Sequence, residues 1–158
     1  MVSRRCRLRT GGTYLSTQRI DCYAMYQILL PVDDDTDRAA AQAQYVLGLP
    51  GETDEVSVTV AHAYTDEPSS AGSDSYNEES AGVIEAVDVL SAAGVTVEQS
   101  ELYVPVAESI VEMASEIGAD KVVVSGRNRS PAGKALFGSV TQSVALNSPV
   151  PVAIVGAE

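Results

Sequence analysis

Short apolar runs alternate with amphipathic segments along most of the chain. The runs are rich in Val, Ile, Leu and Ala, a composition typical of strands that are buried on both faces of a parallel sheet. They cover residues 28–32, 56–63, 121–125 and 150–155. A fifth strand is expected at residues 95–103, where apolar and polar residues alternate as in a half-exposed edge strand.

The segments between these runs have helical spacing. Apolar residues recur there every three or four positions, which predicts helices that each have one apolar face. These apolar stripes are Ala39, Ala43 and Val46; Val83, Val87 and Leu90; and Ala107, Ile110, Val111, Ala114 and Ile117. A last helix is expected over residues 139–147, and Gly94 and Gly118 are expected to end the second and third helices.

Regular alternation of strands and helices predicts the fold class. Five strands joined by four helices favour an α/β fold with three layers, α/β/α, in which helices cover both faces of a parallel sheet. The pattern spans residues 25–158, which we interpret as one domain. In such sheets ligands bind beyond the carboxyl ends of the strands, where the strand order reverses.

Residues 1–24 differ from the rest of the chain. They contain five arginines against Asp21 alone, a net charge of +4 in a chain whose net charge is −12. They show neither strand nor helix spacing, and they lack the apolar stretch of a signal peptide. We expect a basic leader that is disordered, or a start of translation at Met25; a targeting segment is the third alternative.

The remaining residues carry a net charge of −16. Such an excess of acid repels nucleic acid, so we expect no nucleic acid as a partner. We interpret it as a halophilic acidic surface, since concentrated salt screens the repulsion. No apolar run reaches about 18 residues, so we expect neither a membrane span nor a membrane partner. Both cysteines lie in residues 1–24, so residues 25–158 can form no disulfide framework, and we expect a cytoplasmic protein.

The loop after the fourth strand contains the clearest candidate chemistry. Three of the five cations of the acidic domain lie in this loop: Arg127, Arg129 and Lys134. Gly126 allows close approach to the backbone, and Gly138 and Ser139 open a helix whose free N–H groups favour an anion. One interpretation is an anionic ligand, since Arg and Lys pair strongly with phosphate. The other is a capping turn whose cations balance local acids.

Three segments together resemble the universal stress protein family. They are the first strand with its acid (residues 28–33), the start of the last helix (residues 138–141) and the closing run (residues 149–155). The resemblance covers residues 25–158 and implies a five-stranded parallel sheet of order 3-2-1-4-5. It also implies a role in stress response or signalling, ATP bound in a strand-end cleft in one branch of the family, and a homodimer formed through the last strand, residues 150–155.

The resemblance assigns roles to several positions. Asp33 matches the acid at the adenine end, and Ala63 matches a residue that lines the base pocket. Ser125 and Gly126 match the pair beside the ribose and phosphates, and the residues from Gly138 onward match donors to the phosphate tail. The candidate nucleotide-binding residues are Pro31, Val32, Asp33, Ala63, Ser125, Gly126, Arg127, Arg129, Gly138, Ser139 and Val140.

The chain also departs from the family's ATP-binding pattern. Arg129 stands where that pattern has its second glycine, and the eight residues 130–137 are one fewer than the pattern has before its next glycine. The guanidinium of Arg129 either grips phosphate or fills the site. ATP, with Mg²⁺ as an accompanying ion, is therefore the first expectation, and a dimeric interaction module that binds no nucleotide is the alternative. No residue is evidently placed to orient an attacking water, so at most slow ATP hydrolysis is expected, and no catalytic residue is assigned.

Two further features have ordinary structural interpretations. His62, the single histidine, lies in the second strand between two alanines, where a hydrogen-bonded core residue is favoured over a catalyst. The acidic run of residues 33–37 lacks the glycine and glutamate of a calcium loop. We therefore expect it to cap the first helix, and we assign no metal ligands.

Overall fold

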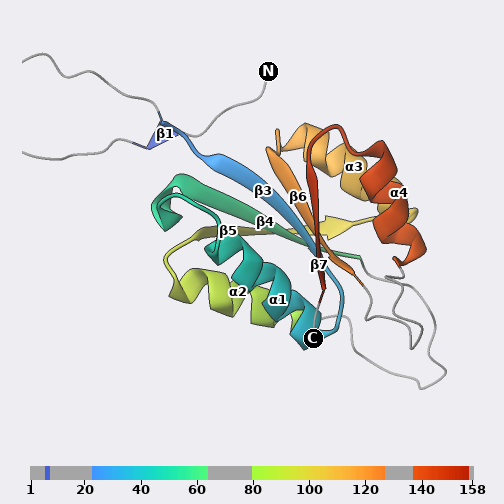
Figure 1. Cartoon of the computed structure of the whole chain (residues 1–158), viewed down its shortest axis with the longest axis horizontal. Helices are drawn as coiled ribbons and strands as arrows, with labels where there is room; N and C mark the ends of the chain where they lie inside the picture. Colours follow the sequence, from blue (N-terminus) through green and yellow to red (C-terminus); the bar gives the residue numbers. More distant parts are fainter. Residues whose placement is uncertain (1–5, 8–22, 64–79, 127–136, 157–158) are drawn as a thin grey trace, which may run out of the picture.

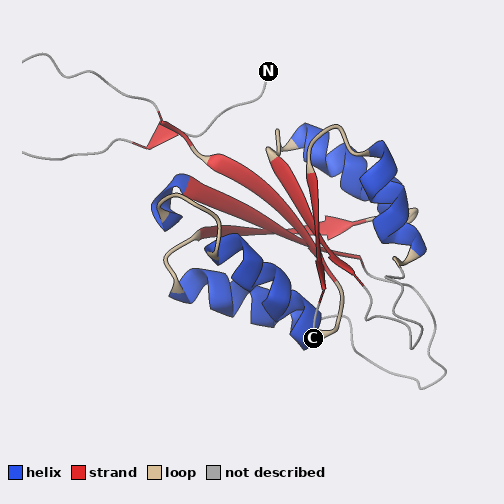
Figure 2. Ribbon diagram, in the orientation of Figure 1, coloured by secondary structure: helices blue, strands red, loops and turns tan. Residues whose placement is uncertain are grey.

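The structure is a computed structural model, and it describes residues 6–7, 23–63, 80–126 and 137–156 of the 158-residue chain. A twisted five-stranded sheet forms the middle layer, and helices cover both of its faces (Figures 1 and 2). The strands are β3 (Tyr26–Val32), β4 (Val56–Ala63), β5 (Thr96–Leu102), β6 (Lys121–Gly126) and β7 (Val152–Gly156). The helices are α1 (Thr36–Leu47), α2 (Ala81–Ala92), α3 (Val106–Glu116) and α4 (Ser139–Asn147), with a short 3-10 turn at Thr53–Glu55.

All five strands run parallel in the order β5-β4-β3-β6-β7. Counted along the chain within this sheet, the order is 3-2-1-4-5, so the predicted three-layer α/β fold is confirmed. The second strand of this sheet and the last helix have the predicted bounds, residues 56–63 and 139–147. The first strand begins two residues earlier than predicted, and the last strand begins and ends later.

Two apolar cores lie on the two faces of the sheet. One core packs α1 and α2 against the sheet through residues such as Ile28, Leu30 and Leu90. The other packs α3 and α4 against the opposite face through residues such as Leu29 and Ile110. Leu29 and Leu30 point to different cores because successive side chains of a strand alternate between its faces. This two-sided burial explains why β3, β4 and β6 are largely continuous apolar runs in the sequence.

The ladder between β3 and β6 is short. Its paired residues are Ile28 with Lys121 and Leu29 with Val122, whereas β3 stays paired with β4 as far as Val32. Beyond Leu29 and Val122 the ladder between β3 and β6 stops. The order of the strands reverses at this place, because the chain adds β4 and β5 on one side of β3 and then β6 and β7 on the other.

The predicted glycine caps are confirmed. Gly94 and Gly118 have φ angles of +83° and +63°, which favour glycine because it has no Cβ atom. After α2, the N–H of Val95 donates to the carbonyl of Leu90 at 3.1 Å. After α3, the N–H of Ala119 donates to the carbonyl of Ala114 at 2.9 Å. Both helices therefore end in the same capping motif.

A small second sheet lies outside the predicted pattern. Two-residue strands β1 (Cys6–Arg7) and β2 (Tyr23–Ala24) pair antiparallel in a separate small sheet. The sequence predicts no element in residues 1–24, because a pair this short leaves no periodicity to detect. The division of the chain at residue 25 stays a prediction.

None of the helices in the described residues combines the length and the apolar character that crossing a membrane requires.

Candidate functional site

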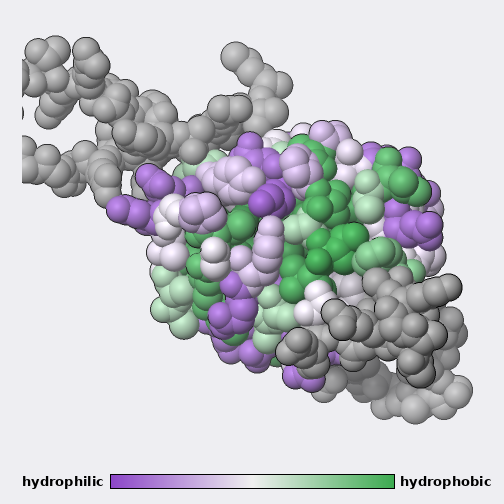
Figure 3. All heavy atoms as spheres, in the orientation of Figure 1, coloured by the Kyte–Doolittle hydropathy of each residue, from purple (hydrophilic) through white to green (hydrophobic). Residues whose placement is uncertain are grey.

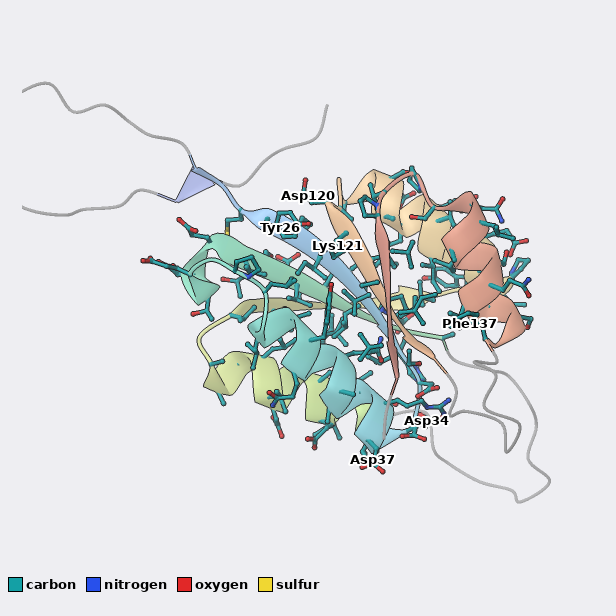
Figure 4. All side chains as sticks on the ribbon, viewed as in Figure 1. Tyr26, Asp34, Asp37, Asp120, Lys121 and Phe137 are labelled. Atoms are coloured by element: carbon teal, nitrogen blue, oxygen red, sulfur yellow. The ribbon has the colours of Figure 1, made fainter. Side chains whose placement is uncertain are left out.

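The carboxyl ends of β3 and β6 form the candidate site. Figure 4 shows Asp34, which follows β3, and Phe137, which precedes α4, at the lower end of the sheet, whereas Tyr26 and Asp120 lie at the opposite end. The site therefore lies at the edge where strands end and helices α1 and α4 begin. It coincides with the reversal of strand order, which is where ligands bind in open α/β sheets.

A single arginine holds the turn that follows β3. Arg38 of α1 places its Nη2 2.9 Å from Asp33 Oδ2 and its Nε 3.2 Å from Asp35 Oδ2. The backbone N–H of Asp35 donates to Asp33 Oδ1 at 3.1 Å, and that of Arg38 donates to Asp35 Oδ1 at 3.0 Å. Asp35 is thus the N-cap of α1, as expected for the acidic run. The Asp33 side chain has a fixed orientation and is 46% exposed.

Asp34 connects this turn to two other elements. Its Oδ1 accepts a hydrogen bond of 2.7 Å from Ser80 Oγ at the start of α2. The same oxygen lies 3.2 Å from Nε2 of His62, near the end of β4. His62 is only 9% exposed, which agrees with its interpretation as a packed, hydrogen-bonded core residue. One carboxylate therefore joins the ends of β3 and β4 to α2.

The end of β6 is joined to α4. Thr141 Oγ1 donates to the carbonyl of Ser125 at 2.9 Å, and Thr141 is buried. The first intrahelical bond of α4 runs from the N–H of Gln142 to the carbonyl of Gly138 at 3.0 Å. The N–H groups that precede Gln142 have no acceptor within the helix. Gly138 provides no side-chain cap, and the first turn has no acidic residue, so this helix end can take an anion.

The structure places nine of the eleven candidate residues. Three lie at the end of β3, one at the end of β4, two at the end of β6 and three at the start of α4; in this order they are Pro31, Val32, Asp33, Ala63, Ser125, Gly126, Gly138, Ser139 and Val140. All nine lie at the carboxyl edge of the sheet. Arg127 and Arg129 lie outside the described residues, and so do residues 130–136 of the shortened loop.

Metal binding by the protein alone has no support in the part of the chain that the structure describes. Those residues contain no group of three or more His, Cys, Asp or Glu side chains that could hold a metal ion. The carboxylates of the acidic run instead accept from backbone N–H groups and lie beside Arg38, His62 and Ser80.

The sequence interpretation missed several residues that support the site, among them Arg38, Ser80 and Thr141. Arg38 is the only cation near the acidic run of residues 33–37 in the sequence. Asp35 lies three residues before it at a position suited to an N-cap, and this spacing could have predicted the contact between Arg38 and Asp35. Ser80 and Thr141 act on residues that are distant in the sequence, so local spacing has no signal for them.

Comparison with known proteins supplies the family. The sequence model described as "Universal stress protein family" matches residues 25–156. The chain belongs to the universal stress protein family. The resemblance seen in the sequence is therefore confirmed for the whole α/β domain.

Solved structures agree with this universal stress protein fold. A universal stress protein from Archaeoglobus fulgidus superposes with a TM-score of 0.57 at 26% identity, covering 82% of this chain and 97% of that one. A universal stress protein in complex with cAMP gives a TM-score of 0.60 at 26% identity, covering 85% of this chain and 98% of that one.

A curated relative matches over a shorter segment. "Stress response protein NhaX" of Bacillus subtilis (strain 168) is 43% identical over 49 residues. This segment is 31% of the present chain and 30% of that protein.

Proposed function

We propose that this protein binds an adenine nucleotide, ATP first of all, at the carboxyl edge of β3 and β6, and that it acts in stress response or signalling. Family membership and the similarity to a universal stress protein in complex with cAMP support the ligand class. The observation that carries the proposal is the pairing, at one edge of the sheet, of a fixed carboxylate after β3 with an uncapped helix start after β6.

Asp33 would recognise the base. Its two oxygens already accept from the N–H of Asp35 and from Arg38, which fixes the plane of the carboxylate. An ionised carboxylate has about four lone-pair sites, so it can accept further hydrogen bonds. The 6-amino group of adenine is a donor that suits such an acceptor, whereas guanine presents an oxygen at that position and would be repelled.

The start of α4 would hold the phosphates. Backbone N–H groups and the positive end of the helix dipole favour phosphate oxygens there, and the hydroxyl of Ser139 is a further donor. Because the described residues offer no metal cluster, Mg²⁺ would be held mainly by the phosphates. Arg127 and Arg129 belong to the adjoining loop by sequence and are proposed as further phosphate ligands.

Calorimetric titration of the full chain with ATP, AMP, cAMP and GTP tests the proposal. We expect binding of the adenine nucleotides and weaker binding of GTP. Replacing Asp33 by alanine should lower the affinity for ATP by about tenfold, the effect of one lost hydrogen bond to a charged group. The matched control is Asp37→Ala, which removes the same charge from the exposed first turn of α1 and should leave the affinity unchanged.

The outcomes separate two functions. Absence of both heat and a thermal shift with every nucleotide would reject the proposal and favour the interaction module without nucleotide. Equal losses in Asp33→Ala and Asp37→Ala would show a general structural effect, because the loss of a carboxylate by itself favours an anionic ligand, and would reject the role of Asp33. Release of more than one equivalent of phosphate per protein molecule would show that the protein also hydrolyses ATP slowly.

We also propose that the protein is a homodimer formed through β7 and that it is cytoplasmic. On the face shown in Figure 3, apolar side chains gather over β7, between the two helical layers. In the described part of the chain β7 pairs with β6 alone, so its outer edge is open to a second copy. Ile154 in this strand is 37% exposed, which gives that edge an apolar contact.

A further inference from the structure

Gln42 is a polar residue in an apolar layer. It lies in the middle of α1 and has no solvent exposure. Its neighbours on the same helix face are Ala39, Ala43 and Val46, all of which belong to the core between α1 and the sheet. Burying an amide among apolar side chains is unfavourable unless its polar atoms have partners.

The amide of Gln42 bridges two strands. Its Nε2 donates to the carbonyl of Pro31 in β3 at 2.8 Å and to the carbonyl of Val123 in β6 at 2.9 Å. Both partners are acceptors, so the orientation of the amide is determined, and both of its hydrogens are used. Its Oε1 is buried and has no hydrogen-bond partner among the residues that the structure describes.

This bridge begins where the ladder between β3 and β6 ends. The last paired residues are Leu29 and Val122, and the bridged carbonyls lie just beyond them. Pro31 has no N–H, so at this position β3 cannot donate a ladder hydrogen bond. The side chain of Gln42 thus replaces the ladder across the point where the strand order reverses.

We propose that Gln42 is a positioning residue, which fixes the spacing between the ends of β3 and β6 and thereby the geometry of the nucleotide site. Asp33 lies two residues after Pro31, and Ser125 lies two residues after Val123. A change in the spacing of the bridged carbonyls therefore moves the two sides of the site relative to each other. This inference rests on the proposed function, because it assigns Gln42 a role in that same site.

The observed chemistry favours positioning over packing alone. An apolar residue of similar shape would fill the same volume and would not bury the unpartnered Oε1. Such a residue would leave the carbonyls of Pro31 and Val123 without this donor. Gln42 donates hydrogen bonds to carbonyls that lie beyond the last paired residues of β3 and β6. The proposed site lies at the ends of the same two strands.

The test compares Gln42→Met with wild type and with Val46→Ala. Methionine keeps the length of the side chain but cannot donate, whereas Val46→Ala weakens the same core without touching either carbonyl. Calorimetry well below the unfolding temperature should show an affinity for ATP lowered by about tenfold or more in Gln42→Met, because a misplaced binding group loses much of its interaction. Val46→Ala should keep the wild-type affinity despite a lower melting temperature.

A second readout needs no ligand. Hydrogen exchange of the free protein should be faster at residues 30–33 and 123–126 in Gln42→Met, and in Val46→Ala it should not be faster there than elsewhere. Gln42→Asn keeps the amide but shortens the side chain, and it should show the same local increase in hydrogen exchange. This variant replaces Gln42→Met in the test if the methionine variant does not fold.

The two proposals fail in different ways. If wild type binds no nucleotide, the proposed function fails, and the role of Gln42 as a bridge between the strands is then decided by hydrogen exchange alone. If wild type binds ATP and Gln42→Met binds equally well, positioning is overturned. Equal losses of affinity in Gln42→Met and Val46→Ala would also overturn it, because a general loss of packing would explain both.

Discussion

Gly82 in the first turn of α2 packs directly against the carbonyl group of Asp33. A Cβ atom at position 82 would overlap this carbonyl oxygen, so no other residue fits without a shift of the backbone. The contact brings the start of α2 onto the turn that carries the proposed base-binding carboxylate. The close approach of the two backbones therefore helps to define where Asp33 lies.

Replacing Gly82 by alanine should destabilise the fold. Alanine favours helix over glycine by about 1 kcal/mol, but an overlap with backbone atoms costs about 1–3 kcal/mol and forces a displacement. We expect a lower midpoint in urea unfolding and a weaker affinity for ATP. Gly48→Ala is the control, because a Cβ atom there meets other atoms only at 3.5 Å and the φ of −82° suits alanine. If Gly82→Ala were as stable as Gly48→Ala, the contact would not constrain the turn.

Thr141→Val should loosen the join between α4 and β6. Valine has the shape of threonine but cannot donate to the carbonyl of Ser125, so one partly buried hydrogen bond is lost. We expect the free energy of unfolding to fall by about 1 kcal/mol. The affinity for ATP should fall with it, since the start of α4 is then less firmly placed. Gln142→Ala, on the exposed side of the same helix, should change neither quantity, and an unchanged Thr141→Val would contradict the prediction.

The acidic surface should make stability depend on salt. Glu112 and Glu116 are exposed, lie four residues apart on α3 and repel each other, and Glu116 also lies at the negative end of the helix dipole. Screening lengths fall from about 10 Å at 0.1 M salt to about 3 Å at 1 M. The melting temperature should therefore rise between these concentrations of potassium chloride. The double variant Glu112→Gln, Glu116→Gln should melt higher at 0.1 M and show a smaller rise, whereas a flat response in wild type would refute the halophilic interpretation.

A dimer through β7 should be sensitive to charge at Ile154. Placing an aspartate in the middle of an apolar contact leaves a buried, unpaired charge, so Ile154→Asp should be a monomer of 16.5 kDa in light scattering, and wild type should have twice that mass. Ile84→Asp makes the same change on α2 at a position of similar exposure, 44%, and should stay dimeric. A monomeric wild type would exclude the dimer.

Strands and helix ends could be predicted because local chemistry determines them. Strands buried on two faces are continuous apolar runs, and Gly94 and Gly118 occupy backbone conformations that other residues avoid. The start of α4 could be predicted from its glycine and serine. These features depend on each segment alone, so one sequence contains the information.

The supports of the site depend on contacts between distant segments. Asp34 pairs with Ser80 and His62, and Gly82 packs on Asp33, but nothing near any of these residues indicates its partner. Gln42 is an exception, because it occupies the i+3 position of the stripe formed by Ala39, Ala43 and Val46 and could have been found by spacing. The helical stripe that predicts α1 consists of apolar residues alone, so it does not include a glutamine.

The short ladder between β3 and β6 has a consequence for the stability of the whole domain. It makes a narrow seam between two parts of the sheet, β5-β4-β3 on one side and β6-β7 on the other. A ligand that touches both Asp33 and α4 would cross this seam, and its binding free energy would add to the energy that holds the two parts together. A rise in nucleotide concentration would then protect the protein from unfolding, and depletion would leave it more exposed to proteolysis.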